Sequence, residues 1–189
     1  MSTNKNKFIR IISFSLLVLF LFQVGAQAAT RSDVKQIIIQ EAQNSRVPAS
    51  LALAVAKVES DFLEDALSSA GARGVMQIMP KTGKTLATHL GIQRFKHSSL
   101  YDPDVSIRLG SYFLGDQVRQ FTNGATADMG FELGLAAYNA GPHNARQWLE
   151  RFPHDDADAF IERIPFKETR LYVKLVLKNY AIYKALSDV

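Results

Sequence analysis

One acidic residue stands at the end of an apolar segment, in the sequence LALAVAKVESDF from Leu51 to Phe62. The spacing of the apolar residues predicts a helix with one buried stripe, formed by Leu51, Val55, Val58 and Phe62. Glu59 follows Val55 by four residues, so its side chain is rotated by only about 40° from the buried direction. Burial raises the pKa of a carboxyl group above about 4.3, so the group can still donate a proton near neutral pH. Glu59 is therefore a candidate general acid.

A less specific interpretation of Glu59 stays open on these residues alone. A glutamate on the flank of a helix is more often a solvated residue or one half of an ion pair. Lys57 or Arg73 could be the basic partner in such an ion pair. The residues around Glu59 do not distinguish the two interpretations, so the other segments of the chain must be considered.

The elements that must position Glu59 are predicted to be helical almost throughout. Capping residues, prolines and glycines mark the helix ends. The first predicted helix starts near Ser32 or Asp33, and the second starts at Pro48. The next two run from Pro80 to Gly91 and from Asp102-Pro103 to Phe121. A further helix ends at Gly141, another runs from Pro142 through Trp148, and the last runs from Pro165 to about Leu186. Only GVMQIMP resembles a strand, and it is too short to be assigned. The fold class is therefore mainly α.

The N-terminal segment has the order of a secretory signal peptide. Lys5, Lys7 and Arg10 precede an apolar run over 11–22, and Ala26-Gln27-Ala28 forms a small-residue cleavage site. The apolar run is short against the roughly 20 residues of a membrane span, which disfavours an uncleaved anchor. We therefore predict a signal peptide over 1–28, one globular domain over 29–189 and no stable membrane span after cleavage.

The composition excludes several classes of partner and site. The net charge of +4 includes Lys5, Lys7 and Arg10, and no acidic residue precedes residue 29. The mature chain therefore carries a net charge of only +1 (4 − 3). With so small a charge, no nucleic-acid partner is expected. The chain has no cysteine, and the four histidines lack zinc spacing, so neither a metal nor a cofactor is predicted. Nothing indicates oligomerisation, and a monomer is assumed.

Three blocks in order carry a resemblance to a known family: ESDFLEDALSSAGARGVMQIMP, LAAYNAGP and IPFKETRLYVKLVL. Together they resemble the soluble lytic transglycosylases (SLT domain), exported enzymes with a goose-lysozyme-like fold that cut the glycan strands of peptidoglycan. The resemblance spans about Ser32 to Tyr183. It implies a lysozyme-like domain with a substrate cleft, periplasmic localisation, and Glu59 as the catalytic residue.

The reaction that the resemblance implies is cleavage of the β-1,4 bond between N-acetylmuramic acid and N-acetylglucosamine. Glu59 would protonate the glycosidic oxygen and then accept the proton of the C6 hydroxyl as that oxygen attacks C1. The product is a 1,6-anhydromuramoyl end, and one carboxyl group suffices where most glycosidases use two. On a continuing helix, Asp61 would point away from Glu59, as would the next two acids; Asp128 or Glu162 could still approach in the fold.

The resemblance also implies a set of substrate-binding residues. Met76 and Gln77 would line the cleft, Tyr138 would help to hold the catalytic carboxyl group, and Asn139 would bind the muramoyl N-acetyl group. Ser60 would orient the site. The predicted substrate-binding residues are Ser60, Met76, Gln77, Tyr138, Asn139 and Tyr172.

Two departures from the family pattern affect the expected shape of the cleft. Leu63-Glu64 replaces the usual turn after Phe62, which predicts that the helix bearing Glu59 runs on further. His143 stands where glycine is common after the Gly-Pro pair, which puts the shape of that loop in question.

Two other functions remain open on the sequence. A lysozyme-type muramidase on the same fold would release fragments heavier by one water than the anhydro product. A non-catalytic glycan-binding module could serve an envelope-spanning machine. The intact set of Glu59, Gln77, Tyr138 and Asn139 favours the enzyme.

Overall fold

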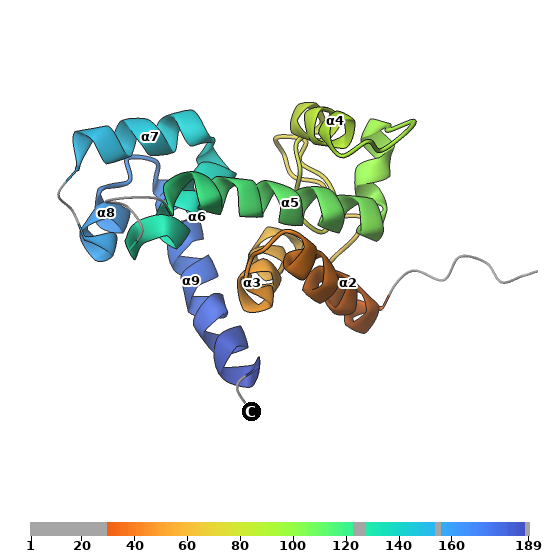
Figure 1. The fold of residues 1–189 in the computed structure, drawn as a ribbon, viewed down its shortest axis with the longest axis horizontal. Coiled ribbons are helices and arrows are strands. Elements are labelled where there is room, and N and C mark those ends of the chain that lie inside the picture. The colour runs from red at the N-terminus through yellow and green to blue at the C-terminus, as the bar shows by residue number, and fades with distance from the viewer. Residues whose placement is uncertain (1–29, 123–127, 154–155, 188–189) are drawn as a thin grey trace, which may run out of the picture. The chain divides into compact units, whose positions relative to one another are not determined.

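The computed structural model describes residues 30–122, 128–153 and 156–187, and the predicted signal peptide lies outside them. The chain divides into two units, Met1–Thr30 and Arg31–Val189, and the second contains every element described below. The elements, labelled as in Figure 1, are α2 (Arg31–Asn44), α3 (Ala49–Ser60), α4 (Pro80–His89), the 3-10 helix η1 (His97–Tyr101), α5 (Pro103–Phe121), α6 (Gly130–Ala140), α7 (Pro142–Arg151), α8 (Ala157–Arg163) and α9 (Lys167–Ser187).

The mainly helical fold is confirmed, and local signals place most helix ends. Asp102 caps α5, because its carboxylate accepts hydrogen bonds from the backbone N–H groups of Asp104 (3.0 Å) and Val105 (3.3 Å). Gly141 ends α6 with a φ of 90°, and Pro142 begins α7. The short elements α8 and η1 were not predicted, since each is too short to show a clear apolar period.

The helix that carries Glu59 ends at Ser60, so the prediction that it runs on past Phe62 is wrong. Asp61 and Phe62 both adopt left-handed backbone conformations, with φ of 55° and 67°. Their N–H groups bond to the carbonyls of Lys57 (3.1 Å) and Ala56 (3.4 Å), which closes the helix end. The Asp61 carboxylate is held outside by Lys57 and by Arg31 at 2.7 Å, and these two cations lower its pKa.

The segment after this helix is a loop rather than a strand. Two isolated antiparallel bridges, Leu67 with Arg73 and Arg73 with Ile78, hold it in shape. Gly74 lies at its tightest point with a φ of 73°, and a Cβ atom there would lie 1.8 Å from the carbonyl oxygen of Leu100. Only glycine allows this approach, which fixes the loop against η1.

The core forms around two helices that are covered on most sides. Helix α3 packs against α2 and α9, and α6 packs against α5, α7 and α9. Leu51 and Val55 are fully buried as predicted, whereas Val58 is only partly buried. Figure 1 shows α9 passing beside α3, with its last turns extending beyond the other helices. The α3–α9 contact brings the helix end bearing Glu59 to the start of α9.

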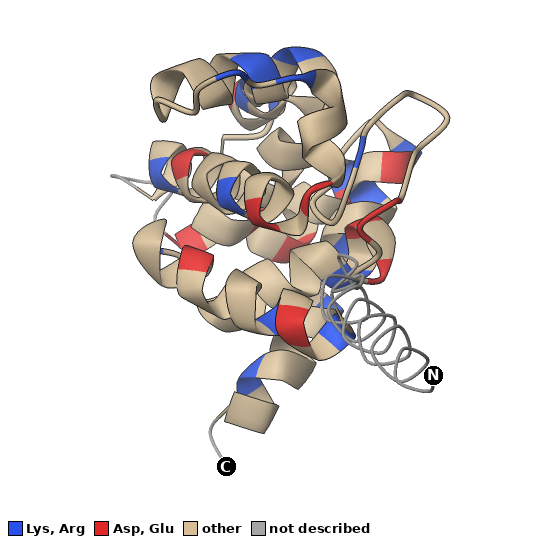
Figure 2. Cartoon of the chain, turned by 90° about the vertical axis from the view of Figure 1, so that its right-hand side faces the viewer, with Lys and Arg blue, Asp and Glu red and all other residues tan. Residues whose placement is uncertain are grey.

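The surface carries charges of both signs. In the view of Figure 2, several helices carry both Lys or Arg and Asp or Glu residues. Within the described ranges, no helix is both long enough and apolar enough to cross a membrane. The outer face of α9 exposes four large apolar side chains: Leu171, Leu175, Ile182 and Leu186.

Candidate active site

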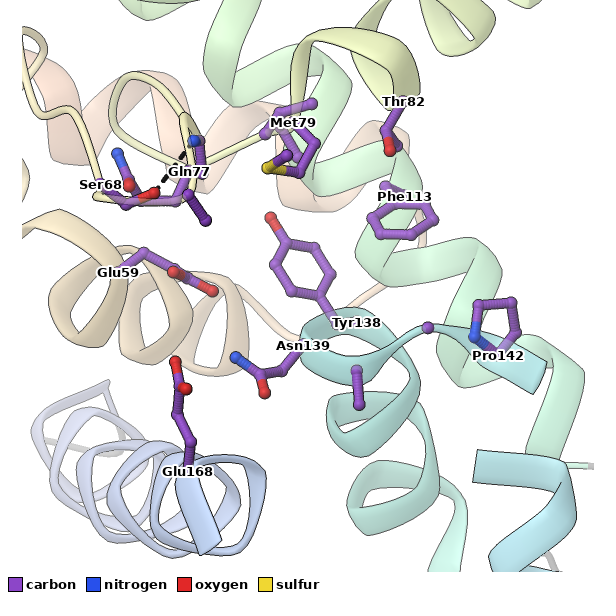
Figure 3. A pocket seen from close by; sticks show the side chains of 15 residues that line it. Glu59, Ser68, Gln77, Met79, Thr82, Phe113, Tyr138, Asn139, Pro142 and Glu168 are labelled. Atoms are coloured by element: carbon purple, nitrogen blue, oxygen red, sulfur yellow. Dashed lines mark hydrogen bonds between the residues drawn. The ribbon is translucent and has the colours of Figure 1, made fainter. Parts of the chain in front are cut away.

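Glu59 opens into a cavity of about 450 Å³. The walls come from the end of α3, the loop after it, α4, α5, the end of α6 and the first turn of α9. Figure 3 shows the principal polar side chains of this wall: Glu59, Ser68, Gln77, Tyr138, Asn139 and Glu168. Segments distant in sequence therefore form one concave site.

The Glu59 carboxyl group has the properties expected of a general acid. Burial raises its pKa to about 7, because the ionised form loses contact with water. The nearby Tyr172 hydroxyl opposes this rise in pKa, and the charge of Glu168 adds to it. A large fraction of Glu59 therefore stays protonated at neutral pH, and no ion pair with Lys57 or Arg73 satisfies it among the described residues.

A second carboxyl group, which the sequence did not predict there, lies in the same cavity. Glu168 extends from the first turn of α9 toward Glu59 (Figure 3). Glu162, one of the two acids considered as possible partners, instead bonds with Lys174 on the exposed surface. Asp128 is not among the residues that line the cavity. Glu168 is part of the third sequence block, but only the α3–α9 contact shows that it reaches Glu59.

The structure describes the contacts of the two tyrosines near Glu59. Tyr138 lines the cavity, but its hydroxyl donates a hydrogen bond to the carbonyl of Met76 at 2.8 Å, so the same proton does not hold Glu59. Tyr172 is buried beside Glu59 and influences its pKa. Among the described residues, the Tyr172 hydroxyl has no hydrogen-bond partner. Tyr172 therefore lies next to Glu59 without forming a hydrogen bond with it.

Met76 does not line the cavity with its side chain, which corrects that prediction. The side chain is fully buried against α5, where a Cβ atom on Gly110 would lie 2.3 Å from the Met76 Cβ. The N–H of Gln77 bonds to the carbonyl of Gly74 at 3.1 Å, so this segment is a turn, with the Met76 side chain in the core and the Gln77 side chain in the cavity wall. Met76 contributes its carbonyl oxygen, which anchors Tyr138.

Gln77 lines the cavity in a fixed orientation. Its φ of 46° is unusual for a residue other than glycine, and such conformations are concentrated at functional sites. The side-chain Nε2 donates to the carbonyls of Gly74 (2.9 Å) and Ala66 (3.1 Å). The amide nitrogen is thus committed to the loop, which leaves the amide oxygen as the group that can accept a hydrogen bond from a ligand.

Two serines near Glu59 differ in position. Ser60 donates to the carbonyl of Val75 at 2.8 Å and does not line the cavity, so it connects α3 to the loop and orients the site indirectly. Ser68 does line the cavity and accepts a hydrogen bond from the N–H of Ala72 at 2.9 Å. That bond leaves the hydroxyl proton of Ser68 free to be donated to a ligand. The sequence did not predict that Ser68 lines the cavity.

Three consecutive residues at the start of α9 contact the cavity, helix α6 and the turn before α9. The carboxylate of Glu168 lines the cavity. The Thr169 hydroxyl donates to Oδ1 of Asn139 at 2.8 Å. The Arg170 guanidinium donates to the carbonyl of Ile164 at 2.9 Å and so holds the turn before α9. The described ranges contain no cluster of three or more His, Asp or Glu side chains that could bind a metal ion.

Comparison with known sequences identifies the family. Residues 36–161 match the Transglycosylase SLT domain, and residues 163–189 match the Soluble lytic transglycosylase helical domain. The chain belongs to the transglycosylase SLT domain family. The SLT domain thus contains Glu59, the loop that follows it, and the Tyr138-Asn139 pair, whereas Glu168 falls within the second match.

Curated relatives share the SLT domain within longer proteins. The chain is 39% identical over 140 residues to the soluble lytic murein transglycosylase of Escherichia coli K12, covering 73% of this chain and 21% of that protein. It is 30% identical over 131 residues to the membrane-bound lytic murein transglycosylase C of Actinobacillus pleuropneumoniae serotype 5b, covering 68% of this chain and 35% of the relative. The chain therefore spans about a fifth to a third of the length of these relatives.

Solved structures share the fold of the SLT domain. One is an inactive Glu-to-Gln mutant of lytic transglycosylase Slt from Pseudomonas aeruginosa, with a TM-score of 0.73 and 39% identity over 81% of this chain and 24% of that chain. Another is the 70-kDa soluble lytic transglycosylase in complex with bulgecin A, with a TM-score of 0.73 and 35% identity over 80% of this chain and 24% of that chain.

Proposed function

We propose that this SLT domain is a peptidoglycan lytic transglycosylase that cleaves the β-1,4 bond between N-acetylmuramic acid and N-acetylglucosamine. The observation that carries the proposal is the Glu59 carboxyl group, which opens into a cavity and has a pKa raised to about 7. The family membership and the lytic murein transglycosylases among its relatives support the choice of substrate.

In the proposed reaction Glu59 acts first as an acid and then as a base. Its carboxyl proton passes to the glycosidic oxygen as the bond from C1 of the muramic sugar to that oxygen breaks. The resulting carboxylate accepts the proton of the C6 hydroxyl of the same sugar, and the C6 oxygen bonds to C1. A 1,6-anhydromuramoyl end forms, water is not consumed, and Glu59 recovers its proton.

The surrounding groups supply distinct parts of this chemistry. The neighbouring Tyr172 hydroxyl can donate to the Glu59 carboxylate once the proton has left. Asn139 and Gln77 present an amide nitrogen and an amide oxygen to the cavity, which suits the N-acetyl and hydroxyl groups of the sugars. The negative charge of Glu168 favours the protonated form of Glu59 before the reaction.

One observation favours the hydrolase as a second candidate. Most glycosidases use a pair of carboxyl groups, and Glu168 provides a second one in the same cavity as Glu59. If Glu168 activated a water molecule, the products would end in reducing sugars. The masses of the products separate the two reactions, because each hydrolysed fragment is heavier by one water.

The decisive experiment digests purified peptidoglycan and analyses the fragments by mass spectrometry. Wild-type protein is expected to release 1,6-anhydromuramoyl fragments, and Glu59→Gln to lower the rate by at least about a thousandfold. Glu64→Gln is the matched control, since it changes an acid that does not line the cavity, and it should retain activity. Reducing ends would favour the hydrolase, and glycan binding without cleavage would favour the non-catalytic module.

We also propose that residues 1–28 direct export to the periplasm, where the glycan strands are the partner. Sequencing the N-terminus of the exported protein tests this proposal, with residue 29 as the expected start. A role in an envelope-spanning machine would require a protein partner in addition to the glycan. Bulgecin A, present in a related solved structure, is expected to bind the cavity and raise the melting temperature of the wild-type protein.

A further inference from the structure

We propose that Thr169 is a positioning residue, which fixes the Asn139 side chain so that its amide nitrogen faces the substrate cavity. The inference rests on the proposed function, and it assigns a specific task to a residue that does not itself line the cavity. It concerns two helices far apart in sequence, since Asn139 ends α6 and Thr169 lies in the first turn of α9.

The contact between the two side chains has the geometry of a directed hydrogen bond. Thr169 is 2% exposed, and its Oγ1 lies 2.8 Å from Oδ1 of Asn139. An amide oxygen only accepts, so the threonine hydroxyl is the donor. Threonine in a helix divides between two χ1 rotamers, and burial together with the bond to Asn139 holds Thr169 in one of them. The Asn139 oxygen is therefore occupied outside the cavity.

This bond leaves the amide nitrogen of Asn139 for the ligand. Figure 3 shows the nitrogen directed to the side of the cavity where Glu59 and Glu168 lie, with the oxygen toward α9. The opposite orientation would place the amide oxygen near two carboxyl groups, which is unfavourable whenever either is ionised. The threonine bond and the carboxyl groups thus favour the same orientation, in which Asn139 donates two N–H groups.

Loss of the threonine hydroxyl should act through Asn139 and not through the fold. Without it, the amide can rotate about its terminal torsion, which has a broad energy profile. The cavity would then meet an acceptor in place of a donor for part of the time. Asn139 itself is exposed, so its replacement should leave the core intact.

The test measures kcat/KM on a purified glycan for wild type and for Thr169→Val, which has the same shape but no hydroxyl. We expect a loss of about tenfold, of the order of one net hydrogen bond. Thr169→Ser should restore most of the activity because it keeps the donor. Thr88→Val on the exposed side of α4 removes a hydroxyl that bonds to its own helix, and it should leave kcat/KM unchanged.

A double-mutant cycle with Asn139→Ala separates positioning from a structural role. In the Asn139→Ala background, Thr169→Val should cause no further loss of kcat/KM, because the group that it orients is gone. Undiminished activity of Thr169→Val, or an additive loss in the double mutant, would overturn the inference. An absence of anhydro products from the wild-type protein would instead refute the proposed function.

Discussion

Glu59 combines a useful pKa with an energetic disadvantage. Because its pKa is about 7 in the folded protein and about 4.5 in the unfolded chain, the folded state holds the proton more tightly. Stability is therefore reduced as the pH rises from about 4.5 through 7, and the full reduction is present above pH 7. A shift of this size corresponds to about 3 kcal/mol at most.

Replacing Glu59 should accordingly stabilise the protein while it removes activity. We expect Glu59→Gln to have a free energy of unfolding higher than wild type by up to about 3 kcal/mol at pH 8. The difference should vanish near pH 4, where the wild-type carboxyl is protonated in both states. Urea denaturation at pH 4, 6 and 8 measures it, and a difference independent of pH would contradict the explanation.

Glu168 should affect the pH dependence of the reaction through its charge. Glu168→Gln removes a negative group that raises the pKa of Glu59, so that pKa should fall. In the proposed reaction Glu59 must be protonated to act first as an acid, and the alkaline limb of kcat/KM should therefore move to lower pH.

The matched control for this variant is Glu162→Gln, which removes the same charge from the exposed pair with Lys174. Its alkaline limb should stay with that of the wild type. If the Glu168→Gln profile also stays unchanged, the two carboxyl groups are not electrostatically coupled as the structure indicates.

At the scale of elements, the loop after α3 depends on Gly74 more than on Gly71. Both have positive φ, but only Gly74 has backbone atoms against the position of a Cβ, whereas Gly71 faces open space. We expect Gly71→Ala to lower the free energy of unfolding by about 1 kcal/mol and Gly74→Ala by about 3 kcal/mol or more. Thermal unfolding checks the order, and equal effects would contradict it.

Local signals predicted the longer helices, but they did not predict every helix end or the short elements α8 and η1. The cap at Asp102 and the Gly141-Pro142 break act through neighbouring backbone groups, so the sequence around them contains the information. The end of α3 depends on left-handed residues and on Arg31, which is thirty positions away in the sequence from Asp61. No helical period encodes that contact.

The site could be predicted in part for the same reason. The position of Glu59 at the edge of a buried stripe followed from helical spacing, and Gln77 and Asn139 do line the cavity. The presence of Glu168 follows from the contact between α3 and α9, and the bond of Thr169 to Asn139 follows from the contact between α6 and α9. Neither contact leaves a signature in the spacing of one segment.

At the scale of the whole molecule, the first half of α9 packs into the core, whereas its last turns contribute little to stability. Thr169, Tyr172, Val173 and Val176 are buried, whereas almost every described residue after Tyr180 is exposed. A chain ending at Lys184 should keep its activity and lose at most a few degrees of melting temperature.

A chain ending at Ile164 should lose cooperative unfolding, because the apolar sides of α3 and α6 would then face water. Circular dichroism melts of the two truncated chains measure the contrast. A cooperative transition in the shorter chain would show that α9 is dispensable for the fold.

Under the proposed function, the contact between α3 and α9 also bears on when activity appears during folding. Before that contact forms, the Glu59 carboxyl group is more open to water, so its pKa should lie closer to that of a free glutamate than it does in the folded protein. A chain whose final helix has not yet docked therefore lacks a competent acid, even if α3 and its loop are already in place. If residues 1–28 direct export as proposed, a chain that is still folding in the periplasm should not yet cut glycan strands.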